Sequence, residues 1–288
     1  MTLVINLLNT GGKYCIIFTN LSYEKVGCVK MEYPINNKFM QEEALSADHA
    51  KDLVVMANRI LANEGVFDAF GHISVRNPEN PDTFWISRAI SPAAVTKDDL
   101  IEMDFEARMV SGNPNYTPFA ECVIHAAIYK VRPDVSSVCH PHPPEVIPFT
   151  CTDIQLKGIY HQFCSFYDGI PVFTDLPPEC GMLVNTMELG SKLAQVLGNK
   201  RGVLIRNHGV VVVGESVPRA VFSSVTLRDN AKMLLSTLAL GVQPTYIGLE
   251  ESKKSTYSHL CGQGLKRSWD YWATRAKNNF KDVANIGV

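Results

Sequence analysis

The sequence predicts an α/β fold, because short β-branched runs and amphipathic helical patterns interleave along most of its length. Its 288 residues are enough to bury a large core. Hydrophobic residues make up 46% of the chain and charged residues 19%, a balance typical of folded globular proteins and not of disordered or fibrous ones. Because no internal repeat, low-complexity tract or Pro/Ser-rich linker divides the chain, we expect one domain at residues 43–241, with extensions at residues 1–42 and 242–288.

The domain begins with a helix followed by a pair of strands. Ser46 or Asp48 can cap a helix in which apolar residues recur at helical spacing until Gly65 ends it. Residues 72–76 and 83–87 are predicted strands, and the sequence Asn-Pro-Glu-Asn-Pro-Asp between them has strong turn chemistry. We therefore expect an antiparallel hairpin.

Later elements place two histidine motifs at strand ends. A helix over residues 119–130 stops near Pro133, and the β-branched run at 135–138 leads into Cys139-His140-Pro141-His142-Pro143-Pro144, with a further helix from Glu145. Residues 202–206 and 210–213 are predicted strands on either side of the turn Asn207-His208-Gly209. A long amphipathic helix is predicted over residues 217–240.

The two extensions carry weaker signals. Near the N-terminus, the turn Asn9-Thr10-Gly11-Gly12 between apolar runs predicts a hairpin or an arm on a neighbouring subunit. Beyond residue 241, Lys and Arg outnumber Asp and Glu, which favours a solvated helical extension over an interaction patch.

Charge and cysteine usage exclude several classes of protein. A formal net charge of −2 provides no field that would collect nucleic acid or an anionic membrane, so we expect neither as a partner. The eight cysteines form no Cys-x-x-Cys pair, which indicates reduced thiols. No apolar run approaches the roughly 18 residues of a membrane span, and the first lysine follows the apolar start, the reverse of a signal peptide. We expect a cytoplasmic protein.

His140 and His142 form the first candidate metal site. Each precedes a proline, which disfavours the α conformation, so both residues should be extended. Residues i and i+2 of an extended chain face the same side, and two parallel imidazoles are suited to sharing a divalent cation. The alternative is an exposed turn that merely contains histidines.

His208 and Glu121 can complete this site. Gly209 can adopt a positive φ, turning the chain so that the His208 ring projects from the sheet end, although a plain turn histidine is the alternative. Glu121 lies near the start of a mostly apolar helix, one turn before His125, and a buried carboxylate needs a partner. Its alternative is a surface contact. Three histidines and a carboxylate around an open position are typical of a catalytic rather than a structural metal site.

Four segments together resemble the class II aldolase/adducin family over roughly residues 43–240: Gly71-His72-Ile73-Ser74-Val75-Arg76, Glu121 to His125, His140-Pro141-His142, and Asn207-His208-Gly209. The resemblance implies a three-layer α/β/α fold with a central, mostly antiparallel sheet, and a homotetramer with sites between subunits. It also implies that His140, His142 and His208 bind the metal and that Glu121 is the catalytic acid/base. The implied cofactor is one divalent ion, first Zn²⁺, with Mn²⁺, Co²⁺ or Fe²⁺ as alternatives.

Departures from the sugar-phosphate aldolases of that family narrow the substrate. Where those enzymes hold a phosphate, this chain has His72, Ser87-Arg88-Ala89 and Phe119-Ala120, so a phosphate would lose hydrogen bonds and meet an apolar wall. Arg88 and His72 suit a carboxylate instead. Ser87, Arg88, Tyr160 and His161 most resemble the branch of decarboxylases acting on hydroxylated aromatic acids and ring-cleavage products, and with His72 they are the candidate substrate-binding residues. Their alternatives are a surface ion pair for Arg88 and ordinary structural positions for the others.

The predicted function is a metal-dependent carbon–carbon lyase, foremost a decarboxylase of a small hydroxylated aromatic or keto acid acting through a metal-stabilised enolate. Glu121 would return a proton to carbon, a role requiring a carboxyl pKa raised by its apolar helix. Three alternatives stay open: a class II aldolase acting on a non-phosphorylated hydroxy-keto acid, a non-haem Fe(II) oxygenase, and a non-catalytic adducin-like interaction module.

Overall fold

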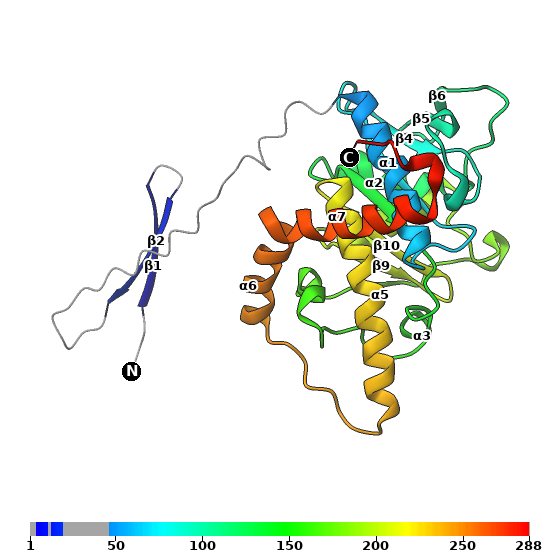
Figure 1. Ribbon diagram of the computed structural model, residues 1–288. Coiled ribbons are helices and arrows are strands. Elements are labelled where there is room, and N and C mark those ends of the chain that lie inside the picture. The colour runs from blue at the N-terminus through cyan, green and yellow to red at the C-terminus, as the bar shows by residue number, and fades with distance from the viewer. Residues whose placement is uncertain (1–3, 11–12, 20–45, 288) are drawn as a thin grey trace. The chain divides into compact units, whose positions relative to one another are not determined.

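The structure, a computed structural model, describes residues 4–10, 13–19 and 46–287, and the chain divides into the units Met1–Phe39 and Met40–Val288 (Figure 1). In the first unit, β1 (Val4–Thr10) and β2 (Lys13–Thr19) pair antiparallel across the predicted Asn-Gly turn. This agrees with the hairpin predicted there. The remainder of the predicted extension at residues 1–42 lies outside the described residues.

The second unit is built on one mixed sheet with the strand order β6-β5-β4-β3-β7-β10-β9-β8. Its strands are β3 (His72–Arg76), β4 (Thr83–Ser87), β5 (Leu100–Asp104), β6 (Met109–Ser111), β7 (Ser137–His140), β8 (Val172–Phe173), β9 (Gly202–Ile205) and β10 (Gly209–Gly214). The pairing of β8 with β9 is parallel, and the other neighbours pair antiparallel. The mostly antiparallel sheet is therefore confirmed.

Helices cover both faces of this sheet (Figure 1). One hydrophobic core joins the sheet to α1 (Ala47–Asn63), α5 (Val217–Ala239) and α7 (Gly262–Asn279), and the other joins it to α2 (Cys122–Val131) and α4 (Met187–Leu197). Along β10, Val210 and Val212 enter the first core while Val211 and Val213 enter the second, as strand alternation requires. The three-layer α/β/α fold predicted from the family resemblance is confirmed.

Several predicted elements are observed with small changes in length. The Ser46 hydroxyl accepts a hydrogen bond from the His49 N–H and begins α1 as expected. α2 begins at Cys122 rather than 119, because the preceding residues form a tighter turn closed by Cys122 N–H and the Phe119 carbonyl. The helix predicted from Glu145 is a single turn, α3 (Ile147–Thr150), which ends at a bend in the polar stretch beginning with Cys151.

The C-terminal segment is helical as predicted but is not a solvated extension. α6 (Leu249–Leu260) and α7 belong to the same compact unit as the sheet, and α7 buries Leu265, Trp269 and Trp272 in the core shared with α1 and α5. The lysines and arginines that suggested a solvated tail occupy the other faces of these amphipathic helices. Of the helices in the described residues, none has the length and apolarity needed to cross a bilayer.

Candidate metal centre

The four predicted metal-site residues come from three separate parts of the fold. His140 is the last residue of β7 in the middle of the sheet, and His142 follows it after Pro141. His208 lies in the turn between β9 and β10, and Glu121 immediately precedes α2. Because β7 and β10 pair antiparallel, the end of β7 and the start of β10 lie at the same end of the strands, and this brings the two histidine motifs together.

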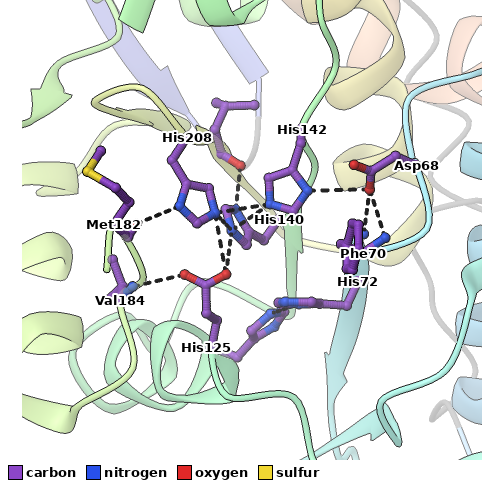
Figure 2. A network of polar contacts seen from close by, with 12 residues as sticks. Asp68, Phe70, His72, His125, His140, His142, Met182, Val184 and His208 are labelled. Atoms are coloured by element: carbon purple, nitrogen blue, oxygen red, sulfur yellow. Dashed lines mark hydrogen bonds and ion pairs between the residues drawn. The ribbon is translucent and has the colours of Figure 1, made fainter. Parts of the chain in front are cut away.

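The three imidazoles converge through their Nε2 atoms (Figure 2). The Nε2 of His140 lies 3.2 Å from that of His142 and 3.2 Å from that of His208, and the remaining Nε2 pair is 3.1 Å apart. Glu121 Oε2 lies 3.4 Å from the Nε2 atoms of both His140 and His208. All four ligand atoms lie within 4.8 Å of one another.

Each imidazole is oriented by a hydrogen bond from its other nitrogen. The Nδ1–H of His140 donates to the Val210 carbonyl at 2.9 Å, and that of His208 donates to the Met182 carbonyl at 2.7 Å. The Nδ1–H of His142 donates to Asp68 Oδ1 at 3.4 Å. With the proton on Nδ1, an imidazole in its neutral form directs its Nε2 lone pair toward the shared point.

This donor set fits a divalent cation. Three lone pairs at such short separations repel one another, and a cation between them converts that repulsion into coordination. Three imidazoles with a carboxylate suit Zn²⁺, Mn²⁺, Co²⁺ or Fe²⁺ rather than a hard ion such as Ca²⁺. The residues therefore match the metal that the sequence predicts, without selecting one element.

The electrostatics of Glu121 differ from the prediction. Burial raises the pKa of its carboxyl, but the contacts with His140 and His208 lower it by more, so its pKa lies below the usual range. The expectation of a raised pKa is wrong, because it considered the apolar helix and not the imidazoles facing Oε2. Burial together with His140 and His208 lowers the pKa of His142 to about 4, which keeps that ring neutral at pH 7.

The β9–β10 turn also differs from its predicted conformation. Asn207, not Gly209, has the positive φ, at 54°. Glycine is needed at 209 for space: an added Cβ would lie 2.6 Å from the Pro141 carbonyl oxygen and 2.8 Å from His142 Cδ2. The small residue thus lets the His-Pro-His segment pass close to the turn that carries His208.

His72 borders the centre and begins a buried hydrogen-bonded chain. It is opposite His140 in the β3–β7 pairing, and the two ring centroids are 5.3 Å apart. His72 Nδ1 is 2.8 Å from His125 Nε2, His125 Nδ1 is 2.7 Å from Ser74 Oγ, and Ser74 Oγ is 2.7 Å from the Tyr129 hydroxyl. The Phe119 ring, 4.4 Å from that of His72, supplies the apolar wall expected from the sequence.

The other predicted substrate residues make their contacts with residues outside this cluster. Arg88 donates to Asp99 at 2.8 Å and lies over the Tyr116 ring. Ser87 shares a strand face with Trp85, in the core on the α1 side. The rings of Tyr160 and His161 contact each other, and His161 contacts His259 of α6. Their roles in substrate binding stay predictions.

Sequence reasoning missed the groups that orient the ligands. Asp68 lies 74 residues from His142, and only its local turn chemistry is visible in the sequence. The Met182 carbonyl and the Val184 N–H, which donates to Glu121 Oε1 at 2.9 Å, are backbone groups in an irregular segment. The positive φ of Met182, 72°, shows how unusual that segment is.

Comparison with known proteins gives consistent matches. Residues 52–235 match the model of the Class II Aldolase and Adducin N-terminal domain. Decarboxylase tropJ of Talaromyces stipitatus is 31% identical over 235 residues, covering 74% of this chain and 88% of that protein. The 3,4-dihydroxyphthalate decarboxylase of Arthrobacter keyseri is 26% identical over 206 residues, covering 67% of this chain and 80% of that protein.

A solved structure gives the same fold. The L-fuculose 1-phosphate aldolase from Glaciozyma antarctica superposes with a TM-score of 0.68 at 24% identity, covering 82% of this chain and 91% of that one. At this level of identity the likeness concerns the architecture of the chain and not its substrate.

Proposed function

The chain belongs to the class II aldolase and adducin family, and from this premise we propose that it is a metal-dependent carbon–carbon lyase, a decarboxylase of a small hydroxylated aromatic or keto acid. The observation that carries the proposal is the convergence of three Nε2 atoms, with Glu121 Oε2 3.4 Å from two of them. Two relatives named as decarboxylases support the loss of CO2 over an aldol cleavage.

A divalent cation, when bound, would supply a Lewis acid that polarises a carbonyl or phenol oxygen of the substrate. His140, His142 and His208 would hold it. Phe119 against His72 favours a substrate without phosphate at this wall, because an apolar ring offers a phosphate no hydrogen bond. An aromatic acid would instead find an aromatic surface there.

Glu121 would move the proton. The Val184 N–H fixes Oε1, so Oε2 is the oxygen free to accept and return a proton. Its lowered pKa keeps Glu121 a carboxylate, which would accept the proton of a substrate hydroxyl whose own pKa a bound cation would lower. When the carbon–carbon bond breaks, CO2 leaves, the electron pair stays on the substrate carbon, and Glu121 returns the proton to that carbon.

The test begins with the metal content of the protein purified without added metal, measured by elemental analysis beside His140→Ala. We expect near-stoichiometric Zn, Mn or Co that the variant loses, followed by CO2 release from a hydroxylated aromatic acid. Glu121→Gln should keep the metal and lower turnover by about 10²–10⁴-fold. No metal in the wild-type protein after incubation with divalent ions would contradict the proposal, leaving an adducin-like module.

Other products would redirect the assignment. Aldehyde formed from a hydroxy-keto acid without CO2 would identify the aldolase alternative. Iron with oxygen uptake would identify the oxygenase alternative. Either result would retain the metal centre and replace the decarboxylation step.

We further propose a homotetramer in the cytoplasm, from the family resemblance and from the cysteines. The six cysteines between Cys122 and Cys261 are free thiols. Light scattering coupled to size-exclusion chromatography measures the assembly, and a monomer would contradict it.

A further inference from the structure

We propose that Asp68 is a positioning residue of the metal centre, which orients His142 and ties it to the turn leading into β3. This inference rests on the proposed metal-dependent function. Asp68 is not among the converging ligands, and neither motif spacing nor composition marks it.

The three ligand histidines are not held in the same way. His140 and His208 donate to backbone carbonyls, of Val210 and Met182, which no substitution of those side chains removes. His142 alone donates to a side chain, the Asp68 carboxylate. It also lies beyond the end of β7, whereas His140 is held in the sheet. The orientation of His142 therefore depends on a single side chain, the carboxylate of Asp68. The other two rings do not depend on any side chain in this way.

The carboxylate oxygen that accepts from His142 is itself fixed by the backbone. Asp68 Oδ1 accepts the Phe70 N–H at 2.8 Å and the Gly71 N–H at 3.1 Å (Figure 2). These two hydrogen bonds close a turn at residues 68–71. The next residue is His72, the first residue of β3, which pairs with His140 of β7. One oxygen thus sets the direction of a ligand and the path of the chain that delivers His72.

A carboxylate acceptor does more than a carbonyl would. It makes a charge-assisted bond to an imidazole N–H and raises the basicity of the ligating nitrogen, which strengthens coordination. The Asp68 side chain is 45% exposed, so it can accept this hydrogen bond as a carboxylate without the cost of a fully buried charge.

The experiment measures Zn²⁺ affinity of the full-length protein by competition with a chromophoric chelator. Asp68→Ala should weaken Zn²⁺ binding by about 10–100-fold, the usual effect of removing a group that orients a ligand. Asp68→Asn keeps an oxygen for the Phe70 and Gly71 N–H groups and removes the charge, so we expect a smaller loss of affinity. His142→Ala sets the value for loss of the ligand itself, and Asp82→Asn, an exposed carboxylate in the β3–β4 turn, is the control.

The outcomes separate this inference from the function on which it rests. Wild-type protein that binds neither Zn²⁺ nor, in the same competition, Mn²⁺, Co²⁺ or Fe²⁺ contradicts the metal centre itself. Wild-type protein that binds Zn²⁺ while both Asp68 variants bind it equally well overturns only the positioning role. A loss of affinity in Asp68→Ala matched by a lower melting temperature of the metal-stripped protein, with Asp68→Asn unchanged in both, would also overturn it, because turn closure alone would then explain the effect.

Discussion

Gly209 gives the His140-Pro141-His142 segment room to pass the β9–β10 turn. Gly209→Ala would bring a methyl group to 2.6 Å from the Pro141 carbonyl oxygen, so His142 must shift. We expect metal affinity to fall by about tenfold or more, and the free energy of unfolding by about 1–3 kcal/mol. Gly169→Ala is the control: its φ of 84° makes it strained, but no atom lies within 4 Å of the new Cβ. Gly169→Ala should lower the stability of the protein and leave its metal affinity unchanged. Equal metal affinities for Gly209→Ala and the wild type would contradict the role given to Gly209.

Ser74 joins His125 to Tyr129 inside the sheet–α2 layer. Ser74→Ala leaves both partners short of a hydrogen bond in a fully buried site, so unfolding free energy should fall by about 1–3 kcal/mol. Ser223 is also fully buried, but its hydroxyl has no hydrogen-bond partner among the described residues. Urea titration measures the free energy of unfolding of both variants, and Ser223→Ala should therefore leave it unchanged or raise it. Equal losses of unfolding free energy in the two variants would contradict a stabilising role for the hydrogen bonds that link the His72 and Tyr129 side chains.

His125 makes stability depend on pH. Burial, with a smaller effect of His140, lowers its pKa to about 3 from the usual 6.5, so the folded chain keeps the ring neutral. Below pH 6.5 the unfolded chain takes up a proton that the folded chain does not, and stability must fall as the pH falls. His125 alone contributes up to about 1.4 kcal/mol per pH unit.

The window from pH 6.5 to 5 separates this effect from Glu121, whose lowered pKa acts in the same direction only near and below its usual 4.5. Urea unfolding of metal-stripped protein at pH 7, 6 and 5 should show a shallower slope for His125→Gln. His72 and His142, whose pKa values are also lowered, keep part of the slope in that variant. Identical slopes would rule out a neutral buried ring at position 125.

The candidate metal-site residues could be predicted because proline and strand alternation act locally. His-Pro-His-Pro fixes its own conformation. The ligand atoms of His140, His142, His208 and Glu121 lie within 4.8 Å of one another, and their roles in binding a metal and in catalysis stay predictions. The pKa of Glu121 and the role of Asp68 depend on neighbours 19 or more residues away. No local pattern contains that information.

At the scale of elements, α4 packs closely against α2. A Cβ on Gly190 would be 2.8 Å from the Val123 carbonyl oxygen and 3.2 Å from the Ala127 Cβ, so the two helices pack closely through this glycine. Gly190→Val should push α4 away from α2 and lower unfolding free energy by about 1–3 kcal/mol. Because Glu121 immediately precedes α2, metal-dependent turnover should fall too.

Ser191→Val is the matched control, since it places the same side chain on the exposed face of the same helix. It removes the hydrogen bond from the exposed Ser191 hydroxyl to the Met187 carbonyl and leaves the helix propensity nearly unchanged, so it should cost less than about 1 kcal/mol. Circular dichroism and urea titration compare the two variants. Because Gly190→Val by itself raises helix propensity, similar losses in the two variants would mean that a valine on any face of α4, and not the contact between helices, explains the Gly190 effect.

Elements with strong local signals were predictable and those defined by partners were not. α1, α5 and the pair β3–β4 have caps, turns or long periodic patterns, and they begin and end at or near the predicted residues. β8 has two residues and exists through its pairing with β9. α7 shows its apolar stripe clearly, yet its charged residues suggested solvent because the sequence does not reveal which surface receives the stripe.

At the scale of the whole molecule, the sheet lies between two hydrophobic cores that support different parts of the structure. The core on the α2 and α4 side supports Glu121 and the buried chain from His72 to Tyr129. The core on the α1 and α5 side is completed by α7 and by Val283, close to the C-terminus. Strands of the sheet contribute side chains to both, so a loss of packing on one side should reach the metal centre on the other.

Two truncations test this arrangement. A chain ending at Gly241 lacks α7 and exposes the apolar surfaces of α1 and α5 that Trp269, Trp272 and Ala276 cover. Each large side chain removed from the core represents about 1.5–3 kcal/mol, which exceeds the stability of most domains once several are lost. We expect that chain to aggregate or to unfold well below the wild-type melting temperature, and not to hold metal. A chain starting at Met40 keeps the four converging residues and both cores, so it should still fold and bind Zn²⁺. If the chain ending at Gly241 instead melts like the full chain, residues 43–241 are the independent domain that the sequence first predicted, and α7 is an accessory to it.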